Sequence, residues 1–269
     1  MLAIPPVLIG LPYDAGSSYL RGAAEAPPLI RRALASPAGN GFAERGVEVL
    51  CDSGVEDRGD LVLPPTSEAA GIIEAAIGEL ARVHRPFLAL GGDHAITYPI
   101  LRGLAEASLE RLTILQIDAH PDLYDEFEGR RDSHACPFAR IMEDGLAAHL
   151  VQVGIRASTA HQRTQAGRFG VEQIDMRAWV DGARPAIAGD VYVSIDVDAI
   201  DPAFAPGVSH REPGGLTVRD VLGLLLTLDA RVVGADLVEY NPRQDVGDLT
   251  AGVAAKIAKE ILATFQVET

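Results

Sequence analysis

The sequence is poor in basic residues and in cysteine. Its 269 residues include 23 Lys and Arg against 38 Asp and Glu, which gives a formal net charge of −15 at pH 7. This balance disfavours nucleic acid and anionic membranes as partners, because both require a basic surface, and it favours a small cationic ligand or a metal ion. The two cysteines, Cys51 and Cys136, are too few for a disulfide framework, so we expect a reduced, cytoplasmic protein.

Long apolar runs and targeting signals are also missing. No run reaches the roughly 18 to 20 residues that a membrane helix needs. The opening segment, MLAIPPVLIGLPYDAGSSYL, has neither the basic stretch nor the cleavage site of a secretory signal. There is no repeat, linker or low-complexity tract, and 48% of the residues are hydrophobic. The sequence therefore predicts one large soluble domain over residues 1–269.

Short apolar runs alternate with helical patterns along the chain. The runs that we predict as buried strands are Pro6–Leu11, Val47–Cys51, Pro86–Leu90, Leu112–Ile117, Leu150–Val153, Val191–Val197 and Val232–Val238. The predicted helices are Glu68–Val83, capped by Thr66 or Ser67, Val218–Leu228, opened by a Thr217–Asp220 capping box, and Ala251–Phe265, started by Thr250. Apolar strands separated by helices indicate an α/β fold with a mostly parallel central sheet flanked by helices on both faces.

Acidic and histidine side chains follow four of the predicted strands. They are Asp93 and His94 in GGDH, Asp118, His120 and Asp122 in DAHPD, Asp196, Asp198 and Asp201 in DVDAIDP, and Glu239 in EYNP. Parallel α/β sheets bind their ligands at the carboxyl ends of the strands, so these side chains should meet at one edge. Three aspartates within six positions would repel one another there, which indicates that a cation lies among them.

The spacing of these residues favours a site for two metal ions. Alternate residues of an extended segment point the same way, so DxHxD and DxD can each face one point. With His94, the set offers four carboxylates and two imidazoles, without thiolate. Such ligands suit Mn²⁺, and also Zn²⁺, Fe²⁺, Co²⁺ or Ni²⁺. Two divalent ions would balance the four negative charges and could activate a water molecule near neutral pH.

Four segments of the sequence resemble the arginase/agmatinase (ureohydrolase) family. They are GGDH, DAHPD, SIDVDAIDPAFAPGVSHREPGGL and VEYNP, in the family's order and spacing. FEGRRDSHACPFARIMEDG and LVQVGIRASTAHQRTQAGRFGVEQIDMR look most like the plant-type arginases. The resemblance is strong over about residues 86–262 and loose before them. It implies a three-layer α/β sandwich, and a homo-oligomer, either a trimer or a hexamer.

The resemblance also implies a role for each site residue. Two Mn²⁺ ions per subunit are expected, one held by His94, Asp118, Asp122 and Asp196, the other by His120, Asp118, Asp196 and Asp198. Asp118 and Asp196 would bridge the two ions. His134 matches the family's proton-shuttling histidine, with Asp122 as a second relay, and Glu239 matches the carboxylate that receives the guanidinium group. A binuclear-manganese ureohydrolase releasing urea from a small cationic guanidino substrate is the function implied.

The substrate that we expect is L-arginine, hydrolysed to urea and ornithine. Animal-type arginases hold the substrate α-carboxylate with an Asn where this sequence has Tyr124, a departure that the plant-type enzymes share. Arg130, four residues before His134, is predicted to line the rim and pair with that carboxylate. Its alternative is a solvent-facing pair with Glu126 or Glu128.

Other readings of the site stay open. Agmatine, guanidinobutyrate, guanidinopropionate and guanidine are alternative substrates. A two-metal phosphoesterase is disfavoured because DAHPD and DVDAIDP have no Arg or Lys for phosphate. An inactive metal-binding scaffold is disfavoured by His134 and Glu239. We expect Asp93 to be structural and Asp201 to cap a turn. A substrate role for His210 and Glu212, which lie in a Gly/Pro-rich loop, stays open, and the sequence decides no role for Cys136.

Overall fold

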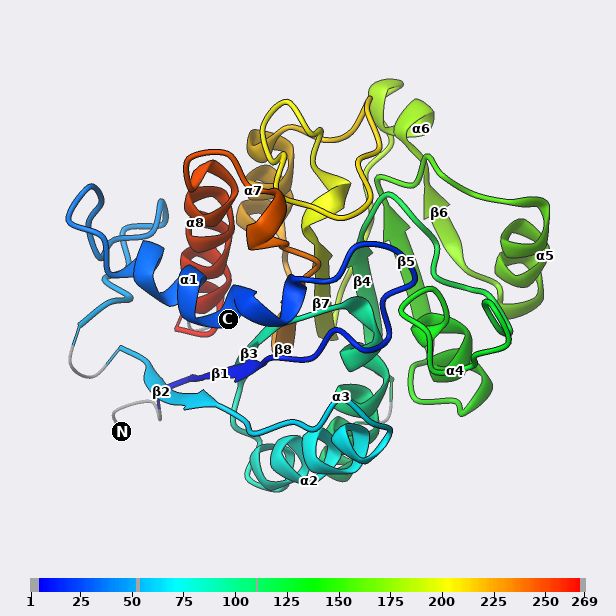
Figure 1. The fold of residues 1–269 in the computed structure, drawn as a ribbon, viewed down its shortest axis with the longest axis horizontal. Coiled ribbons are helices and arrows are strands. Elements are labelled where there is room, and N and C mark those ends of the chain that lie inside the picture. The colour runs from blue at the N-terminus through cyan, green and yellow to red at the C-terminus, as the bar shows by residue number, and fades with distance from the viewer. Residues whose placement is uncertain (1–4, 52–53, 110, 267–269) are drawn as a thin grey trace.

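A parallel sheet of eight strands forms the centre of the molecule. The computed structural model describes residues 5–51, 54–109 and 111–266 (Figure 1). The strand order is β2-β1-β3-β8-β7-β4-β5-β6, and all neighbouring strands are parallel. The strands are β1 (Val7–Leu11), β2 (Glu56–Asp60), β3 (Phe87–Gly91), β4 (Thr113–Ile117), β5 (His149–Val153), β6 (Glu172–Ile174), β7 (Asp190–Asp196) and β8 (Arg231–Val238).

Two groups of helices cover the two faces of the sheet. One face carries α1 (Ala26–Leu34), α6 (Met176–Val180), α7 (Val218–Thr227) and α8 (Leu249–Thr264). The other carries α2 (Glu68–Arg82), α3 (Thr97–Leu104), α4 (Pro137–Glu143) and α5 (Ala160–Phe169). Figure 1 shows α1 and α8 on one side of the sheet and α2 and α3 on the other. The predicted three-layer α/β sandwich is confirmed.

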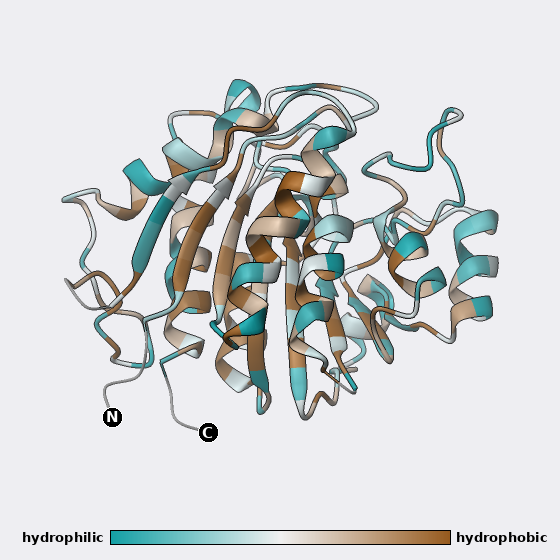
Figure 2. Ribbon diagram, turned by 90° about the horizontal axis from the view of Figure 1, so that it is seen from below, coloured by the Kyte–Doolittle hydropathy of each residue, from teal (hydrophilic) through white to brown (hydrophobic). Residues whose placement is uncertain are grey.

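The inner strands are apolar on both faces because both faces are buried. In β7, Val191, Val193 and Ile195 enter one core cluster, while Tyr192 enters the other. This alternation follows from the two-residue period of a strand, and cover on both sides makes the whole run apolar. In Figure 2 the inner strands are brown along most of their length, whereas the edge strand β2 is teal.

The predicted strand at Val47–Cys51 is wrong. That segment is a loop in which Phe42 and Glu48 form only an isolated antiparallel bridge, and Val49 is buried without joining the sheet. The edge position belongs instead to β2, whose sequence EDRGD has no apolar run. An edge strand is covered less completely, so charged side chains suit it. Two of them, Asp57 and Asp60, pair with Arg31 of α1.

The helix starts agree with the predictions in part. The Thr217–Asp220 capping box at α7 is confirmed, with both reciprocal hydrogen bonds present. Ser67 is the N-cap of α2, but its side chain makes no capping hydrogen bond. The helix α8 begins at Leu249 rather than after Thr250, and Asp245 caps it by accepting from the N–H groups of Thr250 and Ala251, each at 3.0 Å. None of the helices in the described ranges is long and apolar enough to span a membrane.

Thr217→Ala removes the capping oxygen of α7 and should destabilise the protein. The expected loss is about 1 kcal/mol, which lowers the melting temperature by about 2–4 °C for a chain of this size. Thr164→Ala, on the exposed side of α5, is the matched control, since its hydroxyl only bonds back to the Ala160 carbonyl. Equal melting temperatures for the two variants would show that the cap does not stabilise the fold.

Candidate metal centre and active site

The predicted metal ligands meet at the carboxyl ends of four neighbouring strands. β3, β8, β7 and β4 are consecutive in the sheet. His94 follows β3, Glu239 follows β8, Asp196 ends β7 and Asp118 follows β4. Parallel pairing brings these ends to the same edge, as the sequence predicted. A cavity of about 480 Å³ opens there, and His120, Asp122 and Asp198 contribute to its wall.

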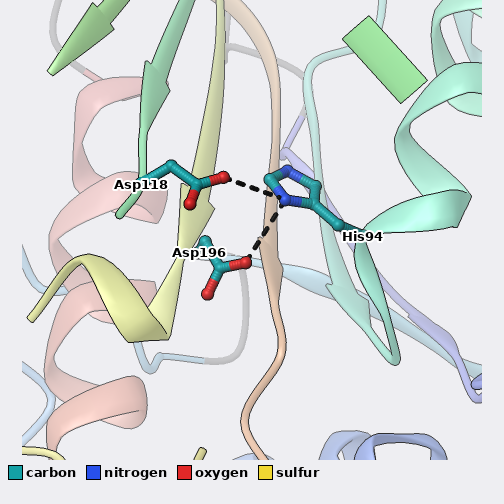
Figure 3. Close-up of side chains that lie close together, drawn as sticks. All are labelled: His94, Asp118 and Asp196. Atoms are coloured by element: carbon teal, nitrogen blue, oxygen red, sulfur yellow. Dashed lines mark ion pairs between the residues drawn. The ribbon is translucent and has the colours of Figure 1, made fainter. Parts of the chain in front are cut away.

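His94 points one ring nitrogen at three carboxylates. Its Nδ1 lies 3.0 Å from Asp122 Oδ2, 3.2 Å from Asp118 Oδ2 and 3.3 Å from Asp196 Oδ2. Figure 3 shows the ring facing Asp118 and Asp196. Among the described residues, this buried Nδ1 has no hydrogen-bond partner. A buried nitrogen surrounded by acceptor oxygens fits a metal ion that all four groups would share.

The other ring nitrogen of His94 fixes this orientation. His94 Nε2 lies 2.9 Å from Ser194 Oγ, and the Ser194 hydroxyl donates to Asp236 Oδ1 at 2.6 Å. Because the serine proton goes to Asp236, the hydroxyl oxygen accepts from His94 Nε2–H. The proton therefore sits on Nε2, and the lone pair of Nδ1 faces the carboxylates. Metal-binding histidines are held in this way by a partner on the far nitrogen.

A second group of ligands shares Asp118 with the first. Asp118, His120 and Asp198 offer donor atoms within 4.8 Å of one another. His120 Nδ1 lies 3.1 Å from Asp198 Oδ2 and 3.7 Å from Asp118 Oδ1. Since Asp118 also belongs to the group with His94 and Asp196, the two groups form one continuous centre. The structure thus brings all six predicted ligands together, and their oxygen and nitrogen donors fit a pair of divalent ions.

Burial makes the carboxylates of this centre depend on a positive charge. Burial, followed by repulsion from Asp198 and Asp118, raises the pKa of Asp196 well above its usual range. Burial and the charge of Asp118 likewise raise the pKa of Asp122 to about 6, although His94 opposes the shift. Ionised carboxylates this close together are costly to bury unless a cation compensates them. The electrostatics therefore agree with the donor set in favouring bound cations.

The backbone is strained where two of the site carboxylates leave their strands. Asp122 and Glu239 adopt φ values of 50° and 63°, in the left-handed region that disfavours residues other than glycine. Hydrogen bonds hold the backbone at both places. The Glu239 N–H donates to the Gly92 carbonyl at 2.8 Å, and Gln152 Nε2 donates to the carbonyl of Pro121, next to Asp122, at 2.7 Å. Strain held by a surrounding network is common where side chains must be aimed at a ligand.

His134 and Glu239 form a buried ion pair beside the metal centre. His134 Nδ1 lies 2.8 Å from Glu239 Oε1, which also accepts from the His94 N–H at 3.0 Å. Burial opposes protonation of His134, but the charge and hydrogen bond of Glu239 outweigh it and raise the pKa of His134 to about 9. Burial likewise opposes ionisation of Glu239, and the paired His134 lowers its pKa below the usual range. Both residues line the cavity, as predicted.

Arg130 is not placed where the sequence analysis expected it. Its guanidinium forms a two-point pair with Asp132, at 3.1 and 3.2 Å, and donates from Nη1 to the Ala15 carbonyl at 2.7 Å. It is absent from the cavity wall, and neither Glu126 nor Glu128 pairs with it. The guanidinium N–H groups that were expected to bind a substrate carboxylate are bonded to Asp132 and to the Ala15 carbonyl instead. We therefore do not assign carboxylate binding to Arg130.

Several cavity residues were not predicted from the sequence. Ser18, in the segment after β1, places its Oγ 2.9 Å from His134 Nε2. Tyr124 and Phe127 form an aromatic part of the wall, with their ring centroids 5.1 Å apart. Arg156 follows β5 and also lines the cavity. No local motif marks these positions, because each reaches the site through the tertiary fold.

The expected structural role of Asp93 agrees with its side chain capping η2 (His94–Ile96) at Ala95, and Asp201 caps a turn by accepting from the Ala203 N–H.

The model of the Arginase family matches residues 5–264 of this chain. The chain belongs to that family. Mitochondrial arginase 1 of Arabidopsis thaliana is 45% identical, over 95% of this chain and 80% of that protein. The solved structure of arginase from Medicago truncatula has a TM-score of 0.91 and is 42% identical, covering 98% of this chain and 88% of that one. N(1)-aminopropylagmatine ureohydrolase of Thermus thermophilus is 36% identical, over 88% of this chain and 82% of that protein.

These relatives correct the predicted cytoplasmic location. The similar arginases of Arabidopsis, rice and Medicago are named mitochondrial. The prediction is wrong because it rested on scarce cysteine and on the lack of a secretory signal. Scarce cysteine distinguishes proteins of the reducing compartments from those of the secretory pathway, where disulfides form. It does not separate the cytoplasm from an organelle that also keeps thiols reduced.

Asp196→Asn should reduce the divalent metal bound per chain. The change keeps the side-chain volume but removes one charge from a carboxylate that lies 3.3 Å from His94 Nδ1 in the first ligand group. Asp190→Asn is the matched control, because Asp190 begins the same strand and pairs with Arg231 at the opposite end. Elemental analysis of both purified proteins gives the measurement. Equal metal contents in Asp196→Asn and the unmodified protein would contradict the assignment of Asp196.

Proposed function

We propose that this protein is an arginase that hydrolyses the guanidino group of L-arginine to urea and ornithine, with two Mn²⁺ ions per subunit. The observation that carries the proposal is the buried centre in which two His/Asp groups share Asp118 and open onto a cavity with the His134–Glu239 pair. Six plant arginases are 42–45% identical to the chain over 95% of its length. Proclavaminate amidinohydrolase, named for another compound, is 35% identical.

The residues that would hold the two ions are those of the metal centre. His94, Asp118, Asp122 and Asp196 would hold one, and His120, Asp118, Asp196 and Asp198 the other. Carboxylate and imidazole donors without thiolate suit manganese. When bound, divalent ions lower the pKa of water from 15.7 to about 7 and so supply a nucleophile near neutral pH.

Glu239 is suited to orient the guanidinium group. Its Oε1 already accepts from His134 and from the His94 N–H, which fixes the carboxylate in place. Oε2 accepts no hydrogen bond within the described part of the chain, so it is available to a substrate N–H. A guanidinium and a carboxylate match in charge and in their planar, two-point geometry. Holding the cation in one orientation converts a collision with the nucleophile into a reaction within one complex.

His134 is suited to give a proton to the leaving amine. Its pKa of about 9 keeps the ring protonated near neutral pH. The ring lines the cavity, and among the described residues only Ser18 contacts Nε2: its Oγ lies 2.9 Å away, and its N–H points at Nε2 from 3.3 Å, which favours release of a proton held there. A positioned general acid contributes typically 10²- to 10⁴-fold to a rate. Asp122, which also lines the cavity, is the second candidate for this proton relay.

We further propose that residues 1–269 form one domain and that the subunits assemble as a trimer or hexamer, as the family resemblance implies. The eight-stranded sheet, which begins at Val7 and includes strands from β1 to β8, supports the first part. The strand order places β1 and β8 on either side of β3, which ties the two ends of the chain into one core.

The substrate proposal predicts urea release from L-arginine with Mn²⁺, at a higher kcat/KM than from agmatine. The comparison uses purified protein stripped of metal and then reloaded. Guanidinobutyrate, guanidinopropionate and guanidine complete the panel. A higher kcat/KM for agmatine would refute arginine as the substrate while keeping the family. Absence of urea from every compound would refute the ureohydrolase function itself.

His134→Ala should slow turnover by roughly 10² to 10⁴ while both metals stay bound, because His134 supplies a proton rather than a metal ligand. The measurements are kcat on arginine and metal content per chain. His149→Ala is the control, since His149 is exposed at the start of β5, away from the cavity. An unchanged kcat would remove His134 from the mechanism, and a loss of metal would mean that it supports the ligands instead.

A further inference from the structure

His210 is a cavity residue to which the mechanism above gives no role. Its ring centroid lies 5.8 Å from that of His120, a metal ligand, and 5.5 Å from that of His134. On the outer side, the ring of Tyr19 lies 5.6 Å away. The Nε2 atom of His210 is hidden from solvent, and no residue in the described ranges hydrogen-bonds to it. A buried polar atom without a partner calls for an explanation, because most such atoms in proteins are paired.

The segment that carries His210 is held firmly at its beginning. The neighbouring Ser209 hydroxyl donates to the Leu20 carbonyl at 2.7 Å and accepts from Asn241 Nδ2 at 2.9 Å. Val208 also forms a bridge with Tyr240, just after β8. These contacts attach the segment to the same sheet edge that carries Glu239. The backbone at His210 is therefore anchored beside the cavity.

The end of this segment is held by an arginine. Arg156 donates from Nε and Nη2 to the Glu212 carbonyl at 2.9 and 2.6 Å, and from Nη2 to the Asp198 carbonyl at 2.7 Å. A Cβ at Gly215 would come within 2.6 Å of Arg156 Nη2, so only glycine lets the chain pass so close. Arg156 thus joins this segment to Asp198, which would hold one of the metal ions. Both ends of the segment that carries His210 are thus anchored beside the cavity.

The cavity that His210 lines indicates what its ring can meet. Its wall contains the carboxylates of Asp122, Asp196, Asp198, Glu212 and Glu239, which favour a cation. A guanidinium cation has five N–H donors and no acceptor. Some of these N–H groups can donate to Glu239, and the unprotonated nitrogen of a neutral His210 imidazole can accept from another. The His210 ring lies beside both His120 and His134, next to the metal centre and to the proposed proton donor.

We infer that the His210 ring turns its Nε2 toward the bound substrate and accepts a hydrogen bond there from the guanidinium group. This inference rests on the proposed function and assigns His210 to the guanidino end, which arginine and agmatine share. The hydrogen bond would exist in every productive complex, whatever the rest of the substrate carries. His210 therefore contributes to recognising guanidino compounds as a class and not to separating arginine from agmatine.

The test compares variants that remove the acceptor with one that keeps an acceptor. His210→Leu and His210→Phe remove it, and His210→Phe also preserves a ring against Tyr19 and His134. His210→Gln retains an acceptor oxygen at a similar distance from the backbone. His149→Phe, at an exposed position away from the cavity, is the matched control. Each protein is loaded with Mn²⁺, its metal content is measured, and kcat/KM is determined for arginine and for agmatine.

The Leu and Phe variants should lose about tenfold to a hundredfold in kcat/KM, which is the usual loss for a hydrogen bond to a charged group. The loss should be the same for arginine and agmatine, with metal content unchanged, and His210→Gln should recover part of it. An active unmodified protein with unaffected Leu and Phe variants would overturn the inference. A loss confined to arginine would overturn it as well, because the ring would then contact the amino-acid end. Loss of metal in these variants would assign His210 to supporting His120 instead. An unmodified protein inactive on both compounds would refute the proposed function.

Discussion

Four buried aspartates, Asp118, Asp122, Asp196 and Asp198, lie close enough to share the ring nitrogens of two histidines. Their mutual repulsion is the constraint on which the rest of the site depends. Water cannot screen them, so only a cation or protonation can relieve it. The apolar packing on both faces of the sheet supplies the stability needed to hold them together. Loss of the compensating cation would therefore affect the stability of the fold as well as the chemistry of the site.

The sheet solves a positioning problem that loops alone would solve poorly. Four neighbouring strands, β3, β8, β7 and β4, carry the polar side chains of the site. Each side chain lies at the carboxyl end of its strand or a few residues beyond it. Neighbouring strands are fixed by hydrogen bonds, so the distances between these side chains vary little. The buried chain from His94 through Ser194 to Asp236 adds rotational control of the ring. Rigid placement of this kind lowers the cost of binding an ion.

The sequence predicted the inner strands and the gathering of six acidic and histidine side chains at one edge because both have local causes. A strand buried on both faces must be apolar throughout, and DAHPD and DVDAIDP carry their ligands within five or seven positions. The edge strands β2 and β6 were missed because partial cover permits polar residues such as those of EDRGD. Arg130 was misplaced because its orientation depends on Ala15, which is far away in the sequence. Ser18 reaches His134 in the same nonlocal way, and no pattern around Ser18 announces it.

The site separates two tasks between two kinds of segment. The predicted metal ligands lie at or just beyond strand ends, whereas Ser18, His134 and His210 come from farther along the connecting segments. Connecting segments tolerate change better than buried strands do. A family built in this way can keep its metal centre while altering the groups that meet the substrate. Relatives named for arginine, proclavaminate and aminopropylagmatine match this chain over most of its length, which agrees with such a division. His134 and His210 would serve the guanidino group that all these compounds share, so differences in substrate should be sought at other wall residues of the connecting segments, such as Tyr124 and Phe127.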